Sequence, residues 1–570
     1  MGNMYTVSGE ELIKYKDRIP WEVHPRPLLR RDDFLNLCGW WDFSVYEHGS
    51  QIAAGGERIR VPFPPESALS GIKRHFSEGA LLVYERAVAL PEGFRKDRVL
   101  LHIDGADQHI EVYINGNFIG AHDGGYSHCT LDITAYGDSF RLRIEARDDL
   151  RDPAEPYGKQ KLKRGGMWYT PFSGLWQPVW IESVPERYVN ELVISTDMVQ
   201  AEIDTKDSSI NGTIEVRTPE GEQSFSLEKG KALIRPESPR LWSPEDPYLY
   251  HFTLHTQGGD TLRSYFALRQ ISMGEVEGIK RILLNGRPYF FNGLLDQGYY
   301  SDGLSTPADP ILYEQDILAA RRLGFNTLRK HIKVEPDLYY AACDRLGMIV
   351  FQDMVNNGTY SFLLDTALPN VGFDKRRDHL MHWSRAGRLL FLRRMEETVN
   401  QLYSFPCILY WTIFNEGWGQ FDSKKVCERF RKLDQSRIID AASGWYDCGA
   451  GDVKSIHVYF KPYDFEPSER PVIVSECGGY TLNLSGHSYD KKKKYGYGTA
   501  ASRIELYEKI KMLYREELLP AVSKGLCGVI YTQLSDVEEE INGLLTYDRK
   551  ELKLPEDAVL FEDTGKFNMF

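Results

Sequence analysis

The sequence predicts a multidomain protein in which two β-sandwiches precede a (β/α)8 TIM barrel. Three observations carry this fold class. The chain has 570 residues, more than a single hydrophobic core usually organises. Short alternating runs of apolar and polar residues, bounded by turn residues, recur up to about residue 272. From residue 273 onward, apolar strands alternate with segments of helical periodicity, as parallel α/β structure requires.

The first two parts of the chain are predicted to be β-sandwiches. Residues 1–185 contain alternating runs such as 110–114, and the Asn115-Gly116 pair that follows this run is a hairpin signal. This pattern is typical of a jelly roll. Residues 186–272 contain a further series of alternating strands, and their length suits a small immunoglobulin-like sandwich.

Residues 273–570 are predicted to form the barrel. Helical periodicity is clear at 389–402 and 503–522, between apolar segments. Eight βα units in roughly 300 residues match a (β/α)8 barrel. The loop at 354–386 after the third strand is long, and such loops are commonly functional. The predicted strands are 289–295, 327–329, 348–353, 408–414, 437–442, 455–459, 472–476 and 528–533.

Composition argues against several classes of function. The formal net charge is -13 and no Lys/Arg stripe is present, so we expect no nucleic-acid partner. No apolar run reaches the roughly 18 residues of a membrane span, and residues 1–31 lack the apolar core of a signal peptide. The eight cysteines form no CxxC pair, which favours reduced thiols in a cytoplasmic protein. We expect neither a metal nor a cofactor.

Two glutamates stand where a barrel enzyme places its catalytic groups. The apolar segment 408–414 runs into Asn415-Glu416, and the segment 472–475 runs into Glu476. Cleavage of a glycosidic bond needs an acid near the leaving oxygen and a second carboxylate across the anomeric carbon. Each glutamate alone could instead cap the following helix. Two glutamates, each after a buried strand, favour the catalytic interpretation.

Several motifs resemble family 2 of the glycoside hydrolases, the group of β-galactosidases, β-glucuronidases and β-mannosidases. The likeness extends over nearly the whole chain, and its order and spacing are specific. The segment Phe414-Asn415-Glu416-Gly417-Trp418-Gly419-Gln420 is the strongest match. The other matching segments are 61–67, 174–180, 265–269, 324–329 and 343–348.

The resemblance implies a role for five residues. Glu416 would be the general acid/base, and Glu476 the nucleophile that forms a glycosyl-enzyme. Asn415 would bind the sugar 2-hydroxyl, and Tyr459 would donate to the nucleophile. Arg329 would pair with the nucleophilic carboxylate, because a nearby cation favours its charged form. For Arg329 a structural ion pair, and for Tyr459 a core aromatic with its hydroxyl at the rim, remain alternatives.

Five further residues lie at or after the ends of predicted strands and are candidates for substrate binding. Asp296 stands where the family often has Arg-His, and His331 could face the site or cap a neighbouring element. Asp353 could bind a sugar hydroxyl, and Trp445 could stack on a sugar face. Tyr531 occupies the place of a Trp that usually ends the eighth strand, where an aromatic ring gives an apolar platform.

The identity of the sugar is left open. Family glucuronidases carry an Asn-x-Lys pair before a Gly-x-x-Thr-x-Asp-Arg-Lys stretch, whereas this chain has Glu540-Ile541-Asn542 there. A glutamate facing a uronate would repel it. We therefore expect a β-galactosidase-type retaining exo-β-glycosidase. The alternatives are a β-glucuronidase, β-mannosidase or α-L-arabinopyranosidase-type hydrolase, a transglycosidase, or a catalytically silent carbohydrate-binding protein. The expected partner is a carbohydrate, and the resemblance leaves a homo-oligomer open.

Overall fold

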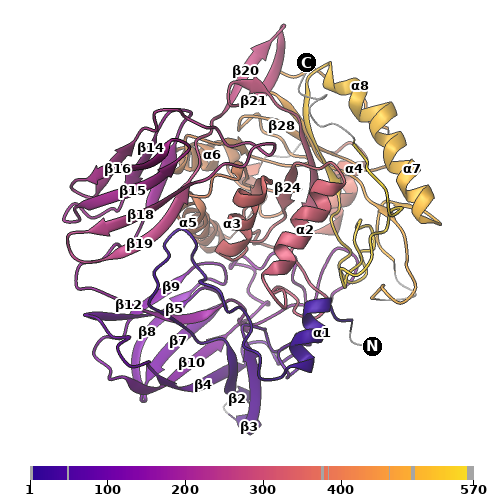
Figure 1. Cartoon of the computed structure of the whole chain (residues 1–570). Helices are drawn as coiled ribbons and strands as arrows, with labels where there is room; N and C mark the ends of the chain where they lie inside the picture. The colour runs from indigo at the N-terminus through magenta and orange to yellow at the C-terminus, as the bar shows by residue number, and fades with distance from the viewer. Residues whose placement is uncertain are drawn as a thin grey trace.

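The computed structural model describes residues 4–47, 50–373, 378–382, 384–460, 462–489 and 494–561. Figure 1 shows three parts: purple strands at the bottom, magenta strands at the upper left, and a barrel with outer helices from the centre to the right. The two β-parts precede an eight-stranded parallel sheet in the chain. The predicted fold class is confirmed.

The first part is a β-sandwich of two antiparallel sheets, preceded by helix α1 (Val7–Lys14). The two sheets enclose one apolar core. The predicted hairpin joins β7 (His109–Ile114) to β8 (Asn117–Asp123), and Asn115 and Gly116 have φ of 51° and 82°, as a type I′ turn requires. One sheet contains β1 (Phe34–Asn36), β12 (Val179–Val184), β5 (Arg98–Ile103) and β9 (Cys129–Asp132), in this order. The other contains β3 (Ser50–Val61), β2 (Gly39–Glu47), β4 (Leu81–Ala89), β10 (Ser139–Arg147), β7 (His109–Ile114) and β8 (Asn117–Asp123), and β6 (Ala106–Asp107) pairs with β11 (Gly174–Leu175).

The second part is a smaller sandwich with its own apolar core. A three-stranded sheet contains β13 (Val193–Thr196), β14 (Ala201–Asp204) and β17 (Lys231–Ile234). A four-stranded sheet contains β16 (Gly221–Leu227), β15 (Gly212–Thr218), β18 (Tyr250–Thr256) and β19 (Thr261–Phe266). The chain then forms a separate sheet of β20 (Ile271–Val276), β21 (Ile279–Leu284) and β22 (Arg287–Pro288), whose first two strands project at the top of Figure 1.

The third part is the barrel, and each predicted strand has its counterpart in it. The parallel strands follow one another in chain order around the barrel, and their side chains are almost all buried. Within the described part of the chain, the ladder is open only between β27 and β28. The strands are β23 (Phe291–Asp296), β24 (Thr327–Lys330), β25 (Ile349–Asp353), β26 (Ile408–Thr412), β27 (Ile438–Asp440), β28 (Lys454–Val458), β29 (Val472–Gly478) and β32 (Leu526–Thr532).

Helices cover the outside of the barrel. The predicted helix at 503–522 contains a π-helical turn (Tyr514–Leu518) between α7 (Arg503–Leu513) and α8 (Leu519–Val522). The long loop after β25 contains another π-helical turn (Leu363–Ala367), the short α4 (Leu368–Asn370) and a 3-10 turn (Asp378–Leu380). The remaining helices are α2 (Ile311–Arg322), α3 (Asp337–Leu346), α5 (Arg385–Leu402), α6 (Ser423–Leu433), α7 (Arg503–Leu513) and α8 (Leu519–Val522), and β30 (Tyr480–Thr481) pairs with β31 (Gly498–Thr499).

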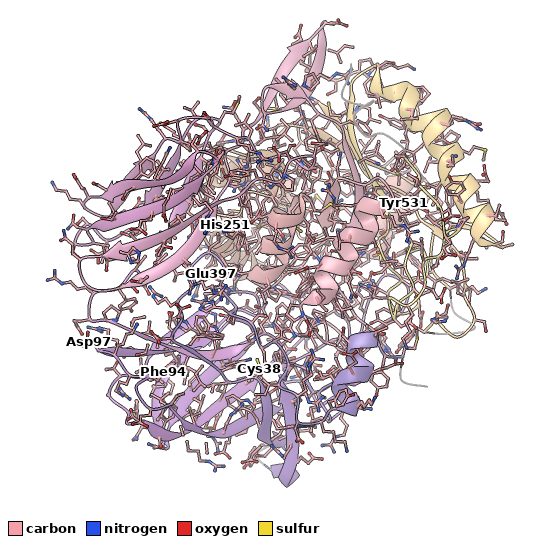
Figure 2. The ribbon with its side chains drawn as sticks, viewed as in Figure 1. Cys38, Phe94, Asp97, His251, Glu397 and Tyr531 are labelled. Atoms are coloured by element: carbon pink, nitrogen blue, oxygen red, sulfur yellow. The ribbon has the colours of Figure 1, made fainter. Side chains whose placement is uncertain are left out.

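Helix α5 joins the barrel to the first sandwich. Arg394 pairs with Glu155 at 3.2 Å and donates to the Asp123 carbonyl at 2.8 Å. Glu397 of the same helix accepts from Arg394 at 2.9 Å, and Figure 2 shows it at the junction of the two parts. From this junction, residues 155–173 of the first part approach the loops that follow β25 and the last barrel strand, through hydrogen bonds of Tyr157 with Gly358 and of Tyr169 with Glu540. This packing allows the first part to contribute to a site on the barrel.

All eight cysteines are free thiols. Within the described residues, no helix combines the length and apolar character needed to cross a lipid bilayer.

Candidate active site

Glu416 and Glu476 lie together at the carboxyl ends of the barrel strands. Glu416 follows β26, and its amide donates to the Ser443 carbonyl at 2.9 Å, so its backbone is fixed against the loop after β27. Its φ of 54° lies in the left-handed region, a strained conformation for a non-glycine residue that recurs at active sites. Glu476 belongs to β29. One carboxylate oxygen of each glutamate lies within 4.8 Å of the other.

Glu476 is held as a carboxylate by its neighbours. Arg329 Nη1 lies 3.1 Å from Oε1, and the Tyr459 hydroxyl donates to Oε2 at 2.6 Å. Burial alone would raise the pKa of Glu476, but the nearby His457, His331 and Arg329 outweigh burial and lower this pKa to about 2. Glu476 is therefore ionised at neutral pH, as a nucleophile must be.

Arg329 connects most of the predicted site residues. Its Nε and Nη2 donate to both oxygens of Asp353 at 3.0 Å, and Asp353 also contacts His331 Nδ1 at 2.9 Å. A third bond from Arg329 Nη2 to Asn415 Oδ1, at 2.9 Å, fixes the Asn415 amide and leaves its NH2 group to donate elsewhere. Arg329 is fully buried, so each of its charged partners is screened little by solvent.

His457 is a site residue that the sequence analysis missed. Its Nδ1 lies 3.0 Å from Glu416 Oε1, and its Nε2 lies 3.4 Å from Glu476 Oε1. The signal that could have found it is strand alternation, since residues two apart on a strand share a face. His457 stands two residues before Tyr459, which was predicted to face the nucleophile.

Trp445 lies beside the acid/base candidate Glu416, and its predicted stacking on a sugar face stays a prediction. Its indole Nε1 donates at 3.0 Å to the Glu416 carbonyl and at 3.0 Å to the Asp365 carbonyl. Its ring lies 5.4 Å from the His457 ring, centroid to centroid. Trp445 therefore fixes the loop that presents Glu416.

The structure does not bring Asp296 to this cluster. In the barrel ladder Leu295 pairs with Arg329 and Asp296 pairs with Lys330, so Asp296 lies on the face opposite to Arg329. Its carboxylate contacts Lys330 Nζ at 2.7 Å and accepts from the Tyr339 hydroxyl at 3.3 Å. The prediction of a substrate-binding role for Asp296 is corrected by this placement.

Tyr531 likewise lies outside the cluster. It pairs with Cys477, the neighbour of Glu476 on the opposite face of β29, and its hydroxyl accepts from the Tyr480 amide at 3.4 Å. The eighth strand contributes the next residue instead, since Thr532 Oγ1 lies 2.9 Å from the Tyr459 hydroxyl. Tyr531 is thus part of the packing outside the barrel strands, not a platform in the site.

A loop of the first sandwich closes one side of the cluster. The Tyr169 hydroxyl donates to Glu540 Oε2 at 2.5 Å, and Asn542 Nδ2 donates to Oε1 at 3.3 Å. Burial raises the pKa of Glu540, Lys159 opposes the rise, and Glu476 adds to it. Lys159 is only 8% exposed, yet its ammonium makes no hydrogen bond or ion pair with any described residue. Lys159 and Tyr169 carry no local sequence signal for this role.

Within the described ranges, Glu416, His457 and Glu476 are the one group of three side chains whose donor atoms could hold a metal ion. These three side chains are also the ones that contact one another in the structure, because His457 lies between the two carboxylates. That the protein needs neither metal nor cofactor stays a prediction.

Comparison with known proteins places this architecture in a family. Residues 275–550 match the family model described as the TIM barrel domain of glycosyl hydrolases family 2, and residues 192–269 match a second model of family 2. The chain therefore belongs to family 2 of the glycosyl hydrolases.

The curated relatives are distant. A putative β-glucuronidase of Formosa agariphila is 24% identical over 431 residues, which are 70% of this chain and 50% of the relative. A β-galactosidase of Thermoanaerobacter pseudethanolicus is 25% identical over 379 residues, which are 62% of this chain and 47% of the relative. The chain thus spans about half the length of these two relatives.

Solved structures share the fold over nearly the whole chain. A β-D-glucuronidase of Dictyoglomus thermophilum has a TM-score of 0.71 at 16% identity, covering 96% of this chain and 99% of that one. A β-galacturonidase of Eisenbergiella tayi, bound to galacturonate, has a TM-score of 0.65 at 17% identity and covers 94% and 97%. At these identities the likeness concerns the fold.

Proposed function

We propose that the protein is a retaining exo-β-glycosidase that acts by double displacement. The observation that carries this proposal is the spacing of the two glutamates, whose oxygens lie within 4.8 Å. Carboxyl groups of retaining enzymes are about 5–5.5 Å apart, whereas inverting enzymes need about 6.5–9.5 Å to admit a water. The short distance supports direct attack by one carboxylate.

The roles of the two glutamates follow from their surroundings. Glu476 attacks the anomeric carbon, the glycosidic bond breaks, and Glu416 gives a proton to the leaving oxygen. Glu416 then takes a proton from water, whose hydroxyl displaces Glu476 from the ester. Arg329 and Tyr459 stabilise the Glu476 carboxylate when it leaves. The free NH2 group of Asn415 is placed to donate to the sugar 2-hydroxyl.

We propose a neutral β-galactoside as the glycone. The Glu540 carboxylate, in the network that closes the site, supports this choice because it would repel a uronate. A β-uronide is the second candidate, and one observation favours it. The Lys159 ammonium has no hydrogen-bond or ion-pair partner in the described chain and could bind a carboxylate. Several relatives are also named β-glucuronidases.

A panel of p-nitrophenyl glycosides tests the function. It includes the β-galactoside, β-glucuronide, β-galacturonide, β-mannoside, β-glucoside and α-L-arabinopyranoside. We expect turnover of a neutral member, with the β-galactoside best. Preference for either uronide would reject the neutral glycone and keep the glycosidase. If no glycoside of the panel is hydrolysed but a free sugar binds, the result would favour a carbohydrate-binding protein.

The exchange Glu476→Gln tests the mechanism. It keeps the side-chain volume and removes the nucleophile, so we expect kcat to fall by at least about 1000-fold while the fold is kept. Thermal unfolding checks the fold. The matched control is Glu245→Gln, which replaces a glutamate that accepts from Tyr289 outside the site at 2.9 Å. Substantial activity in the Glu476→Gln protein would reject the assignment.

A further inference from the structure

His457 bridges the two glutamates through opposite nitrogens of one ring. Nδ1 lies 3.0 Å from Glu416 Oε1, and Nε2 lies 3.4 Å from Glu476 Oε1. The His457 side chain is fully buried, so solvent does not compete for either nitrogen. A histidine that only fills a core also has satisfied nitrogens. Here, however, both nitrogens face carboxylates that the proposed reaction uses.

The second partner of Nε2 is a chain of buried hydroxyls. Ser443 Oγ lies 3.1 Å from Nε2 and 2.8 Å from Ser475 Oγ, and Ser455 Oγ lies 2.7 Å from Ser475 Oγ. A serine hydroxyl can donate or accept. Ser443 can therefore accept from Nε2 when this atom carries the proton and donate to it when it does not. The chain keeps Nε2 satisfied in both states of the ring.

Charge moves across this ring in the proposed reaction. In the free enzyme Glu476 is the carboxylate and Glu416 carries the proton. In the glycosyl-enzyme Glu476 is an ester and Glu416 is the carboxylate. One negative charge thus passes from one side of His457 to the other and back. A ring with the proton on Nε2 donates toward Glu476 and Ser443, and its Nδ1 accepts from the Glu416 acid.

Other titratable and charged groups surround this triad. Beyond Glu416 and Glu476, they include Tyr459 directly after the same strand, Arg329 and His331 from β24 and its following loop, Asp353 from β25, and Asp440 from β27 beside Ser455. Arg329 is already paired with Asp353 and Glu476, and His331 with Asp353. Among these groups of the described chain, His457 alone contacts both glutamates.

We propose that His457 is a positioning residue that sets the spacing of the two glutamates and shares with Glu416 the proton given to the leaving group. This inference rests on the proposed function. In the first half-reaction the proton leaves the Glu416–His457 hydrogen bond for the glycosidic oxygen, as the C–O bond breaks and the Glu476 ester forms. In the second half, water returns a proton to this hydrogen bond, and its hydroxyl releases Glu476.

The exchange His457→Asn tests the proposal with two substrates of one sugar. A phenyl glycoside needs acid assistance, whereas a 2,4-dinitrophenyl glycoside has a leaving group that needs almost none. We expect kcat for the phenyl glycoside to fall about 100-fold or more, because general acid catalysis contributes factors of this size. For the dinitrophenyl glycoside we expect a loss below about 10-fold. KM should change little, and the alkaline limb of the pH profile for the phenyl glycoside should shift, because Glu416 remains but loses its partner.

The matched control is His102→Asn. His102 is a buried histidine of the first sandwich that contacts Thr130 at 2.9 Å and Glu182 at 3.1 Å. This exchange can lower the stability, but the ratio of the two substrates should stay as in the unchanged protein. Equal losses for both substrates in the His457→Asn protein would indicate a merely structural residue and overturn the proposal, as would unchanged rates.

A second measurement does not depend on turnover. In protein labelled with ¹⁵N-histidine, the His457 ring signals are assigned by their absence in the His457→Asn protein. We expect both ring signals to shift in a Glu416→Gln protein, because an amide cannot share the proton with Nδ1. Unchanged ring signals would overturn the proposal even if no glycoside is cleaved. Shifted ring signals, together with no turnover of any glycoside in the panel, would reject only the proposed function.

Discussion

At the scale of single residues, Arg329 is one of three neighbours that keep Glu476, the proposed nucleophile, ionised. Its guanidinium contacts Glu476 at 3.1 Å and Asp353 at 3.0 Å, with all three side chains buried. Burial favours the protonated form of Glu476, and the lowered pKa of about 2 exists because cationic neighbours oppose burial. The site therefore depends on a balance that the removal of one cation would change.

The exchange Arg329→Met should show this change. Without the guanidinium, one of the three groups that oppose burial is lost and the pKa of Glu476 rises, so the acid limb of kcat/KM moves to higher pH. We expect at least about a 100-fold loss of kcat/KM at neutral pH as well, because Asn415 also loses its anchor. Rates measured between about pH 4 and pH 9 on the best panel substrate decide this. An acid limb at the same pH would show that other groups control Glu476.

At the scale of strands, alternation explains which site residues could be predicted. Glu416, Glu476, Arg329 and Tyr459 were found because the ends of parallel strands meet at one edge of a barrel. Asp296 also ends a strand, but the register places it beside Lys330 on the outer face. Whether the last residue of a strand points in or out depends on the register with its neighbour, which a single sequence does not contain.

Asp296 and Asp353 form a matched pair for testing this distinction. The exchange Asp353→Asn weakens the bidentate contact with Arg329, and we expect kcat/KM to fall about 100-fold. The exchange Asp296→Asn weakens an outer contact with Lys330, which keeps Glu335 at 2.9 Å. We expect a loss of about 2 kcal/mol in stability and nearly unchanged kcat/KM. Kinetics and thermal unfolding of both proteins check this, and a large kinetic loss in the Asp296→Asn protein would contradict the placement.

At the scale of the whole molecule, the contacts between the three parts could not be predicted from the sequence. The fold class could be predicted because it follows from periodicity within each part. Lys159 and Tyr169, by contrast, reach the site because the first sandwich packs against α5 and the loop after β25. Such docking depends on complementary surfaces far apart in the chain. No local pattern marks a lysine or tyrosine that faces another part of the molecule.

Arg31 offers a test of how far these contacts hold the parts together. Its guanidinium contacts Glu182 of the first sandwich at 3.0 Å and Asp260 of the second at 2.8 Å, and each side chain is at most 2% exposed. The exchange Arg31→Met leaves two buried carboxylates without their shared cation, which costs about 3–5 kcal/mol. We expect a clearly lower Tm at neutral pH, measured by calorimetry.

The pH dependence of this loss identifies its cause. Burial alone would raise the pKa of Glu182, but His102 and Arg31 outweigh it and lower this pKa to about 2. A lowered pKa stabilises the fold above the unfolded value of about 4.3, and this contribution disappears as the pH falls toward 2. The Tm difference between Arg31→Met and the unchanged protein should therefore shrink below about pH 4. The exchange Arg98→Met removes an exposed pair with Glu186 and should leave Tm nearly unchanged at each pH. A Tm difference that is constant with pH would assign the loss to packing, because only the ionic contribution depends on the charge of Glu182.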